Sequence, residues 1–126
     1  MLFIYPAIIH EDTDGMWAEF PDLTGCSTYG DTMEEILSGA KEAMELFLLG
    51  VLEDGEYPPT PSDIKKIKKL EKNAFATLIQ SDVDLAKNTK SVKKTLTIPA
   101  WLNQRALDKG VNFSKVLQEA LVAKTV

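Results

Sequence analysis

The sequence predicts an α+β protein: a β-β-β-α-β body followed by one strand and two helices. Three features of the 126 residues predict this fold. The first 30 residues contain short alternating segments separated by turn residues, as strands do. Residues 32–51 carry apolar side chains at spacings of three and four, the period of an amphipathic helix. Residues 91–126 contain a strand-like run, a proline, and two helix-like runs separated by a glycine.

Three short strands are predicted before residue 31. Residues 2–10 mix β-branched and aromatic side chains, and Asp14 with Gly15 gives the hairpin signal that follows. Residues 16–20 alternate apolar and polar positions as a half-buried strand would, and residues 26–29 form a short third strand.

A helix is predicted to begin after Thr32. Thr32 and Glu35 form a capping box, in which hydroxyl and carboxylate bond the free backbone N–H groups of the first turn. The apolar face that should pack across the three strands consists of Met33, Ile36, Leu37, Ala40, Met44, Phe47, Leu48 and Val51.

The body is expected to end near residue 84. Residues 56–63 are a proline-rich connection, and residues 64–72 read as a lysine-laced surface helix, either a solvated face or a nonspecific nucleic-acid contact. Residues 75–83 alternate as a fourth strand. The predicted division is a body over 1–84, a linker over 85–90 and a second domain over 91–126.

The strand at 91–98 cannot satisfy its own backbone, and its simplest partner is the same strand of a second copy. A two-stranded ribbon of this kind reads DNA through the major groove. Alternation places Val92, Leu96 and Ile98 on the inner face, and Lys93, Thr95 and Thr97 on the outer face toward base edges and phosphate.

Two helices follow, over 100–109 and 112–124, with Gly110 as a left-handed cap between them. Asn112 or Ser114 caps the second helix, whose N-terminus is a natural phosphate anchor. Its apolar stripe is Phe113, Val116, Leu117, Ala120 and Leu121. We therefore expect dimerisation through Val92, Leu96, Ile98, Phe113, Leu117 and Leu121. A hairpin used only for dimerisation is the alternative.

The net charge of −5 conceals a division along the chain. Residues 1–60 hold 13 acids and one base, which gives −12, and residues 61–126 hold 13 bases and six acids, which gives +7. An acidic body suits a basic protein partner and repels nucleic acid, although acids also serve solubility alone. One cysteine, no signal-like start and no long apolar run lead us to expect a cytoplasmic protein.

Two resemblances give these expectations a family. Residues 98–102 (IPAWL) and 110–121 (GVNFSKVLQEAL) resemble the ribbon-helix-helix DNA-binding proteins, over nearly the whole of 91–124. Residues 5–10 (YPAIIH), 15–26 (GMWAEFPDLTGC) and 30–32 (GDT) resemble the HicB antitoxins, with Thr24 in place of a frequent proline.

The HicB resemblance implies a partial RNase H-like body, to which some members append a ribbon-helix-helix module. It also implies a partner, HicA, a small double-stranded-RNA-binding-like toxin that cleaves mRNA, and repression of the operon that encodes both. We expect toxin contacts on the acidic body, at Asp12, Asp14, Trp17, Glu19 and Asp22. A homodimer is expected, and a tetramer is open.

No catalytic residue, metal or cofactor is expected. One alternative is a free-standing transcriptional regulator whose first domain senses a ligand or oligomerises. Another is a residual metal-dependent nuclease, for which Glu11, Asp12 and Asp14 would supply carboxylates. His10 and Cys26 are a conceivable base and nucleophile, but nothing in the sequence brings them together.

Overall fold

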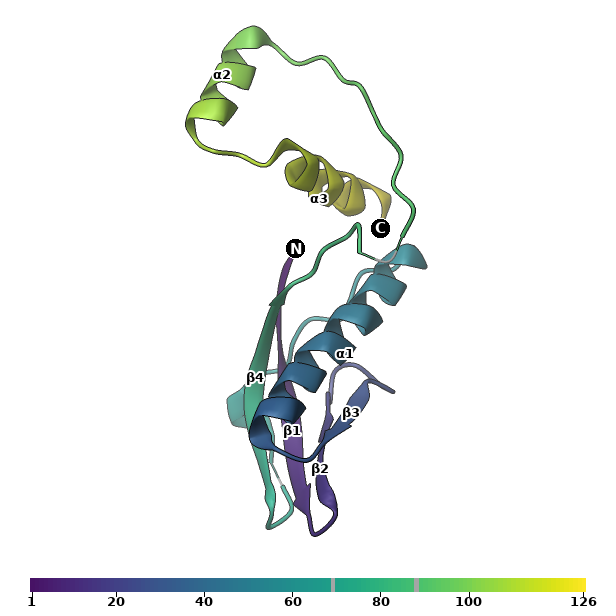
Figure 1. Ribbon diagram of the computed structural model, residues 1–126, viewed down its shortest axis with the longest axis vertical. Helices are drawn as coiled ribbons and strands as arrows, with labels where there is room; N and C mark the ends of the chain where they lie inside the picture. Colours follow the sequence, from purple (N-terminus) through teal and green to yellow (C-terminus); the bar gives the residue numbers. More distant parts are fainter. Residues whose placement is uncertain (69, 88) are drawn as a thin grey trace. The chain divides into compact units, whose positions relative to one another are not determined.

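The computed structural model describes residues 1–68, 70–87 and 89–126, and the chain divides into two compact units, Met1–Asp84 and Leu85–Val126. Figure 1 shows their helices and strands. In the first unit these are β1 (Leu2–Asp12), β2 (Gly15–Glu19), β3 (Ser27–Gly30), α1 (Met33–Glu53), the 3-10 turn η1 (Ile64–Lys66) and β4 (Ala74–Asp82). The second unit contains α2 (Ala100–Asp108) and α3 (Phe113–Thr125).

The first unit is a four-stranded antiparallel sheet in the order β3-β2-β1-β4. β1 and β2 form a hairpin in which Asp12 pairs with Gly15, and β4 pairs along nearly the whole of β1. Gly15 has φ +136°, a conformation that favours glycine and explains the turn at this point. The predicted order of strands and helix is confirmed, with strand bounds shifted by one or two residues.

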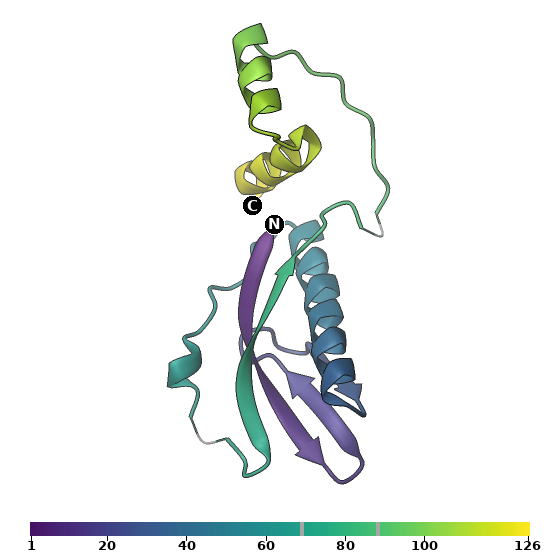
Figure 2. The same ribbon diagram turned by 60° about the vertical axis from the view of Figure 1, so that its left-hand side comes forward.

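α1 covers one face of the sheet, and the contacts of Thr28 and Ser81 identify that face. A Cβ added to Gly39 of α1 would meet Thr28 Oγ1 at 3.0 Å, and the Ser81 hydroxyl donates a hydrogen bond to Glu45 of α1. Strand alternation and register then place Phe3, Tyr5, Ala7 and Ile9 of β1 on this side, where all four are buried. Figure 2 shows α1 and the described parts of the connection, 54–68 and 70–73, flanking β1 and β4.

The predicted face of α1 is correct at its centre and wrong at its start. Ile36, Ala40, Met44 and Leu48 are buried as expected, and so is Leu49, which was not expected. Met33 and Leu37 are exposed, because the first turns of the helix lie against β3, an edge strand of only four residues. The hydroxyl of Thr32 accepts from Glu35 N–H at 3.1 Å as predicted, but the Glu35 carboxylate accepts from Asp31 N–H rather than from Thr32.

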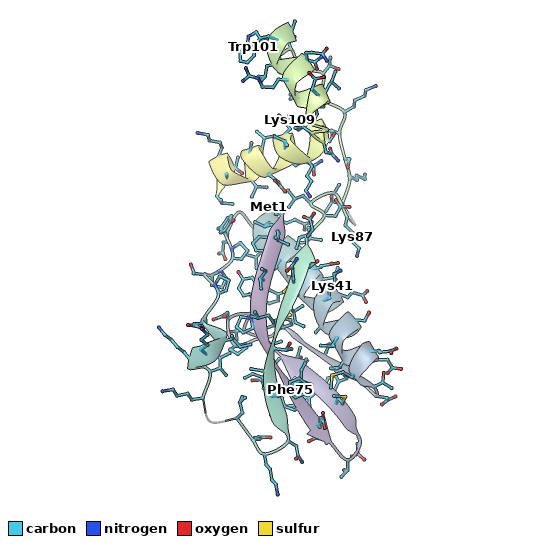
Figure 3. The ribbon with its side chains drawn as sticks, turned by 90° about the vertical axis from the view of Figure 1, so that its left-hand side faces the viewer. Met1, Lys41, Phe75, Lys87, Trp101 and Lys109 are labelled. Carbon is cyan, nitrogen blue, oxygen red and sulfur yellow. The ribbon has the colours of Figure 1, made fainter. Side chains whose placement is uncertain are left out.

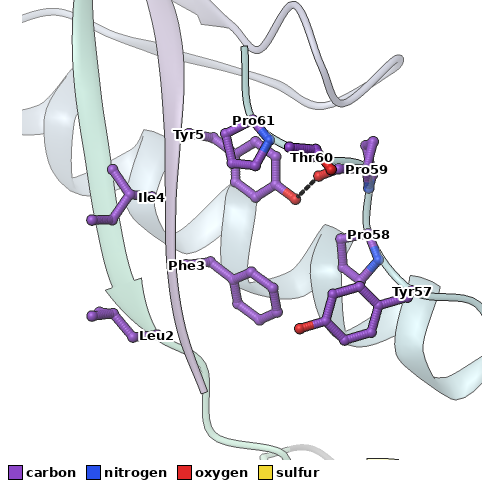
Figure 4. Close-up of a pocket in the computed structure, with 9 residues that line it drawn as sticks. All are labelled: Leu2, Phe3, Ile4, Tyr5, Tyr57, Pro58, Pro59, Thr60 and Pro61. Carbon is purple, nitrogen blue, oxygen red and sulfur yellow. Dashed lines mark hydrogen bonds between the residues drawn. The ribbon is translucent and has the colours of Figure 1, made fainter. Parts of the chain in front are cut away.

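The proline-rich connection is tied to β1 and to the loop between β2 and β3 by one side chain from each. The Tyr5 hydroxyl donates to the Pro59 carbonyl at 2.5 Å, and Asp22 accepts from both the N–H and the hydroxyl of Ser62. Burial, then the charge of Asp22 and the neighbouring Tyr57, raises the pKa of Tyr5, which keeps its hydroxyl a donor. Figure 4 shows the pocket of about 390 Å³ at this point, with Phe3 and Tyr5 turned toward the connection and Leu2 and Ile4 turned away.

The surface helix predicted over 64–72 is wrong in extent, since η1 is the only helical turn among the described residues of this segment. Ile64, Ile67 and Leu70 are half-buried and recur every three residues, a spacing that matches the 3-10 period and not a longer α-helix. Lys69 of this segment lies outside the described residues.

The second unit contains both predicted helices and both predicted end signals. Gly110 has φ +67°, and the Asn112 side chain accepts from Lys115 N–H at 3.0 Å, so Asn112 and not Ser114 caps α3. No side chain of α2 or α3 is fully buried within the single chain.

The predicted strand over 91–98 is exposed throughout and has no strand partner within the described part of the chain. A lone strand has no neighbouring backbone to bond, so its pairing with a second copy stays a prediction. Of the predicted linker 85–90, Asn88 lies outside the described residues. None of the described helices is long and apolar enough to cross a membrane.

Candidate binding surfaces

The face of the sheet opposite α1 presents two aromatic rings in one cross-strand row. His10 pairs with Trp17, and Trp17 pairs with Tyr29, so the three side chains lie side by side on this face. The imidazole of His10 stacks on the indole of Trp17 with a centroid distance of 3.9 Å and an interplanar angle of 8°. Tyr29 is 78% exposed, which leaves its ring free to contact another molecule.

Carboxylates border this aromatic row. Glu19 Oε2 lies 3.4 Å from His10 Nε2, and Glu71 Oε2 lies 3.7 Å from His10 Nδ1. Asp12 has the same strand parity as His10, and Asp14 is exposed in the turn beside it. We call Asp12, Asp14, Trp17, Glu19 and Tyr29 the hairpin face. Exposed aromatic surface beside negative charge fits a protein partner with basic and apolar side chains.

Four of the five predicted toxin-contact residues therefore lie on the hairpin face. Asp22 does not join them, because both of its carboxylate oxygens accept hydrogen bonds from Ser62, at 2.9 Å and 2.5 Å. Tyr29 was not predicted. Its position opposite Trp17 depends on the register of β2 and β3, which alternation within each strand does not give.

The geometry offers no support for the catalytic alternatives. Glu11 and Asp12 alternate along β1 and point to opposite faces of the sheet, and no group of three His, Cys, Asp or Glu residues in the described parts could hold a metal ion. Burial raises the pKa of the Cys26 thiol to about 11, so Cys26 is a neutral thiol near pH 7 and a poor nucleophile.

The second unit presents the predicted DNA-contact and dimer residues on an open surface. The predicted DNA contacts Lys93, Thr95, Thr97, Asn112 and Ser114 are all exposed. The predicted dimer residues Val92, Leu96, Ile98, Phe113 and Leu121 are also exposed, and Leu117 is half-buried. Exposed apolar residues at regular spacing are expected of an interface without its partner.

The two units also differ sharply in charge. Residues 1–84 hold 17 acids and six bases, which gives −11, and residues 85–126 hold two acids and eight bases, which gives +6. The division of charge seen along the sequence thus follows the division into compact units.

The sequence matches a known protein family over nearly its whole length. The sequence model for the HicB-like antitoxin of bacterial toxin-antitoxin systems matches residues 5–125, across both units. The chain belongs to the HicB-like antitoxin family. It is 36% identical over 104 residues to an uncharacterized 14.9 kDa protein of Haemophilus phage HP1, an alignment that covers 81% of this chain and 77% of the phage protein. It is 33% identical over 60 residues to the antitoxin HicB of Pseudomonas fluorescens, covering 48% and 41% of the two chains.

Solved structures of HicB antitoxins share the whole fold. A chain of a toxin-antitoxin complex from Streptococcus pneumoniae aligns over 98% of this chain and 99% of its own length, at a TM-score of 0.64 and 27% identity. The antitoxin HicB of Burkholderia pseudomallei aligns over 95% and 96% at a TM-score of 0.65 and 21% identity, which supports the fold. This HicB-like chain is therefore an antitoxin, a binding protein and not an enzyme.

Proposed function

We propose that this HicB-like antitoxin neutralises a HicA-type toxin by binding it, and represses its own operon by binding operator DNA. One observation carries the first part: the chain matches, over both units, a chain from a toxin-antitoxin complex. A second match, to a chain of the HicA3 and HicB3 complex, covers 60% of this chain and 94% of the other at a TM-score of 0.52 and 26% identity. Because the proposed toxin cleaves mRNA, we expect the antitoxin to bind it in the cytoplasm.

The hairpin face is the surface that we propose for the toxin. A toxin that cleaves RNA needs a basic surface, and the first unit supplies a charge of −11 to complement it. Tyr29 supplies exposed aromatic surface, and tyrosine and tryptophan are among the residues that most often dominate binding energy at protein interfaces. Glu19, Asp12 and Asp14 supply charge around the rings, where charged residues favour fast and selective association.

The second unit is the proposed DNA reader. Pairing of residues 91–98 between two copies would satisfy the open backbone and bury the apolar stripe of α3. It would leave Lys93, Thr95 and Thr97 on the outside of the ribbon for base edges and phosphate. The capped N-terminus of α3, at Asn112 and Ser114, presents free backbone N–H groups for a flanking phosphate.

The toxin part predicts that a neighbouring reading frame encodes a small basic protein, and co-expression of that protein with this chain tests it directly. We expect the neighbouring protein to arrest growth alone, the pair to restore growth, and the two proteins to purify together. Arrest that persists despite expression of both proteins would refute the assignment. Binding to upstream DNA without growth rescue would instead support a free-standing regulator.

Changing Lys93, Thr95 and Thr97 together to alanine tests the division of labour between the units. This variant should lose binding to the DNA upstream of its gene, because the outward groups of the ribbon are removed. It should still dimerise and still restore growth in the presence of the toxin. Loss of growth rescue together with DNA binding would contradict the separation.

A further inference from the structure

One side of α2 carries an aromatic ring and a cation that the proposed dimer and ribbon do not use. The guanidinium carbon of Arg105 lies 4.8 Å from the ring centroid of Trp101, one helical turn earlier. This is a cation–π contact, which restrains the guanidinium over the indole. We call these two residues the Trp–Arg platform. Trp101 is 61% exposed, so most of this large ring remains open to a partner.

The platform points away from the least exposed side of α2. Ala106 is the one residue of α2 that is not exposed, and it marks that side. At 3.6 residues per turn, Arg105 lies about 100° and Trp101 about 140° around the helix from Ala106. A dimer that buries the Ala106 side would therefore leave the platform on the outside.

No acid neutralises the charge of the platform among the residues that the structure describes. Asp108, the acid of α2, accepts a hydrogen bond from the Gln104 amide at 2.9 Å, and Arg105 has no ion pair among the described residues. Lys109 follows Arg105 by one turn, about 6 Å along the helix axis. Figure 3 shows Trp101 and Lys109 at opposite ends of α2. The whole unit has a charge of +6, so an anionic partner fits this surface.

We propose that the Trp–Arg platform binds the phosphate backbone of operator DNA, outside the groove that the ribbon reads. The inference rests on the proposed DNA binding and adds a contact to it. Trp101 follows the ribbon segment 91–98 after two intervening residues, and α2 leads to the phosphate anchor at the start of α3. The platform thus lies, along the chain, between two proposed DNA contacts.

The chemistry of the pair suits phosphate. A guanidinium presents a planar fork of donors that matches phosphate oxygens, and it stays charged at every physiological pH. Because the indole already restrains it, less side-chain freedom is lost when it binds. Trp101 is therefore a positioning residue, and Arg105 is the residue that contacts the phosphate.

The test measures binding of the full-length chain to the DNA upstream of its gene, and to a scrambled fragment, over a series of salt concentrations. Removing one phosphate contact should reduce the magnitude of the slope of log affinity against log salt by about 0.9. At 0.1 M salt this change corresponds to an affinity about eightfold weaker. With one such interaction per subunit of a dimer, Arg105→Gln should weaken binding to both fragments about sixtyfold and reduce the slope by about 2. Lys124→Gln, at the far end of α3, is the matched removal of one charge and should change neither quantity as much.

Trp101 gives a second, independent readout. Trp101→Ala should weaken binding to both fragments while the salt slope stays near the wild-type value, since Arg105 keeps its charge. Trp101→Phe should restore affinity, because a phenyl ring still supports the guanidinium. Dimerisation and growth rescue should be unchanged in all these variants.

Four results for Arg105→Gln would overturn the proposal: unchanged DNA affinity, a weakening confined to the upstream fragment, a loss of dimerisation, or a loss of toxin binding with normal DNA binding. The last of these would make the platform a protein contact. If the unaltered chain binds neither fragment, the proposed repressor function fails with it. If the unaltered chain binds and Arg105→Gln binds equally well, only the platform fails.

Discussion

Leu121 provides a quantitative test of the predicted dimer. This residue of α3 is 53% exposed in the single chain, so about half of its surface is available for burial against a second copy. Burying a whole leucine side chain contributes about 1.5–3 kcal/mol, and half of it about 1 kcal/mol. A two-fold interface contains two copies, so Leu121→Ala should weaken the dimer by about 2 kcal/mol, or about 30-fold in its dissociation constant.

The assay is sedimentation velocity over a dilution series of the full-length chain. Leu107→Ala is the matched control, because Leu107 is 55% exposed, lies in α2 and is not part of the predicted interface. Leucine and alanine are both good helix formers, so neither change should unfold its helix. A dissociation constant for Leu121→Ala equal to that of Leu107→Ala would refute the prediction that the α3 stripe forms the dimer.

Three further predictions concern the first unit. Thr32→Ala removes the hydroxyl that accepts a first-turn N–H at 3.1 Å, so it should lower the free energy of unfolding by about 1 kcal/mol in urea titrations, and Thr32→Ser should recover most of it. Gly30→Ala should lower the free energy of unfolding by about 1–3 kcal/mol in the same titrations, because a Cβ there would meet the backbone N of Ile36 at 2.9 Å. Gly50→Ala is the control and should not lower it, because a Cβ at Gly50 would meet nothing within 4 Å. Burial raises the pKa of Cys26 from 9.0 to about 11, so this thiol contributes stability that is complete below pH 9.0 and lost as pH rises through about 11. Alkylation of native protein at neutral pH should accordingly be much slower than alkylation in denaturant, and equal rates would contradict the burial.

Local signals in the sequence were sufficient for the order of the four strands and α1 in the first unit and of the two helices in the second. The alternation around Trp17, the cap at Thr32 and the left-handed glycine at Gly110 each depend on neighbours within a few residues, and each was found where predicted. The short third strand was predicted from the same kind of signal.

Cross-strand and long-range contacts could not be predicted in this way. Tyr29 joins the hairpin face only because β3 pairs with β2 in one register, and Asp22 is occupied only because residue 62, 40 positions later, returns to it. The exposure of Leu37 follows from the shortness of β3, the strand beneath that end of α1. The ribbon segment 91–98 is a further case, since its partner backbone is predicted to lie in another molecule.

The central claim is that this HicB-like chain neutralises a toxin through the hairpin face of its first unit. Isothermal titration of the neighbouring toxin into full-length Tyr29→Ala chain tests it most directly, because a ring that is 78% exposed contributes little to the fold. We expect toxin affinity to fall by about 2 kcal/mol, roughly 30-fold, with an unchanged free energy of unfolding. The account would be contradicted if Tyr29→Ala bound the toxin with wild-type affinity while the chain with Lys93, Thr95 and Thr97 changed to alanine no longer bound the toxin.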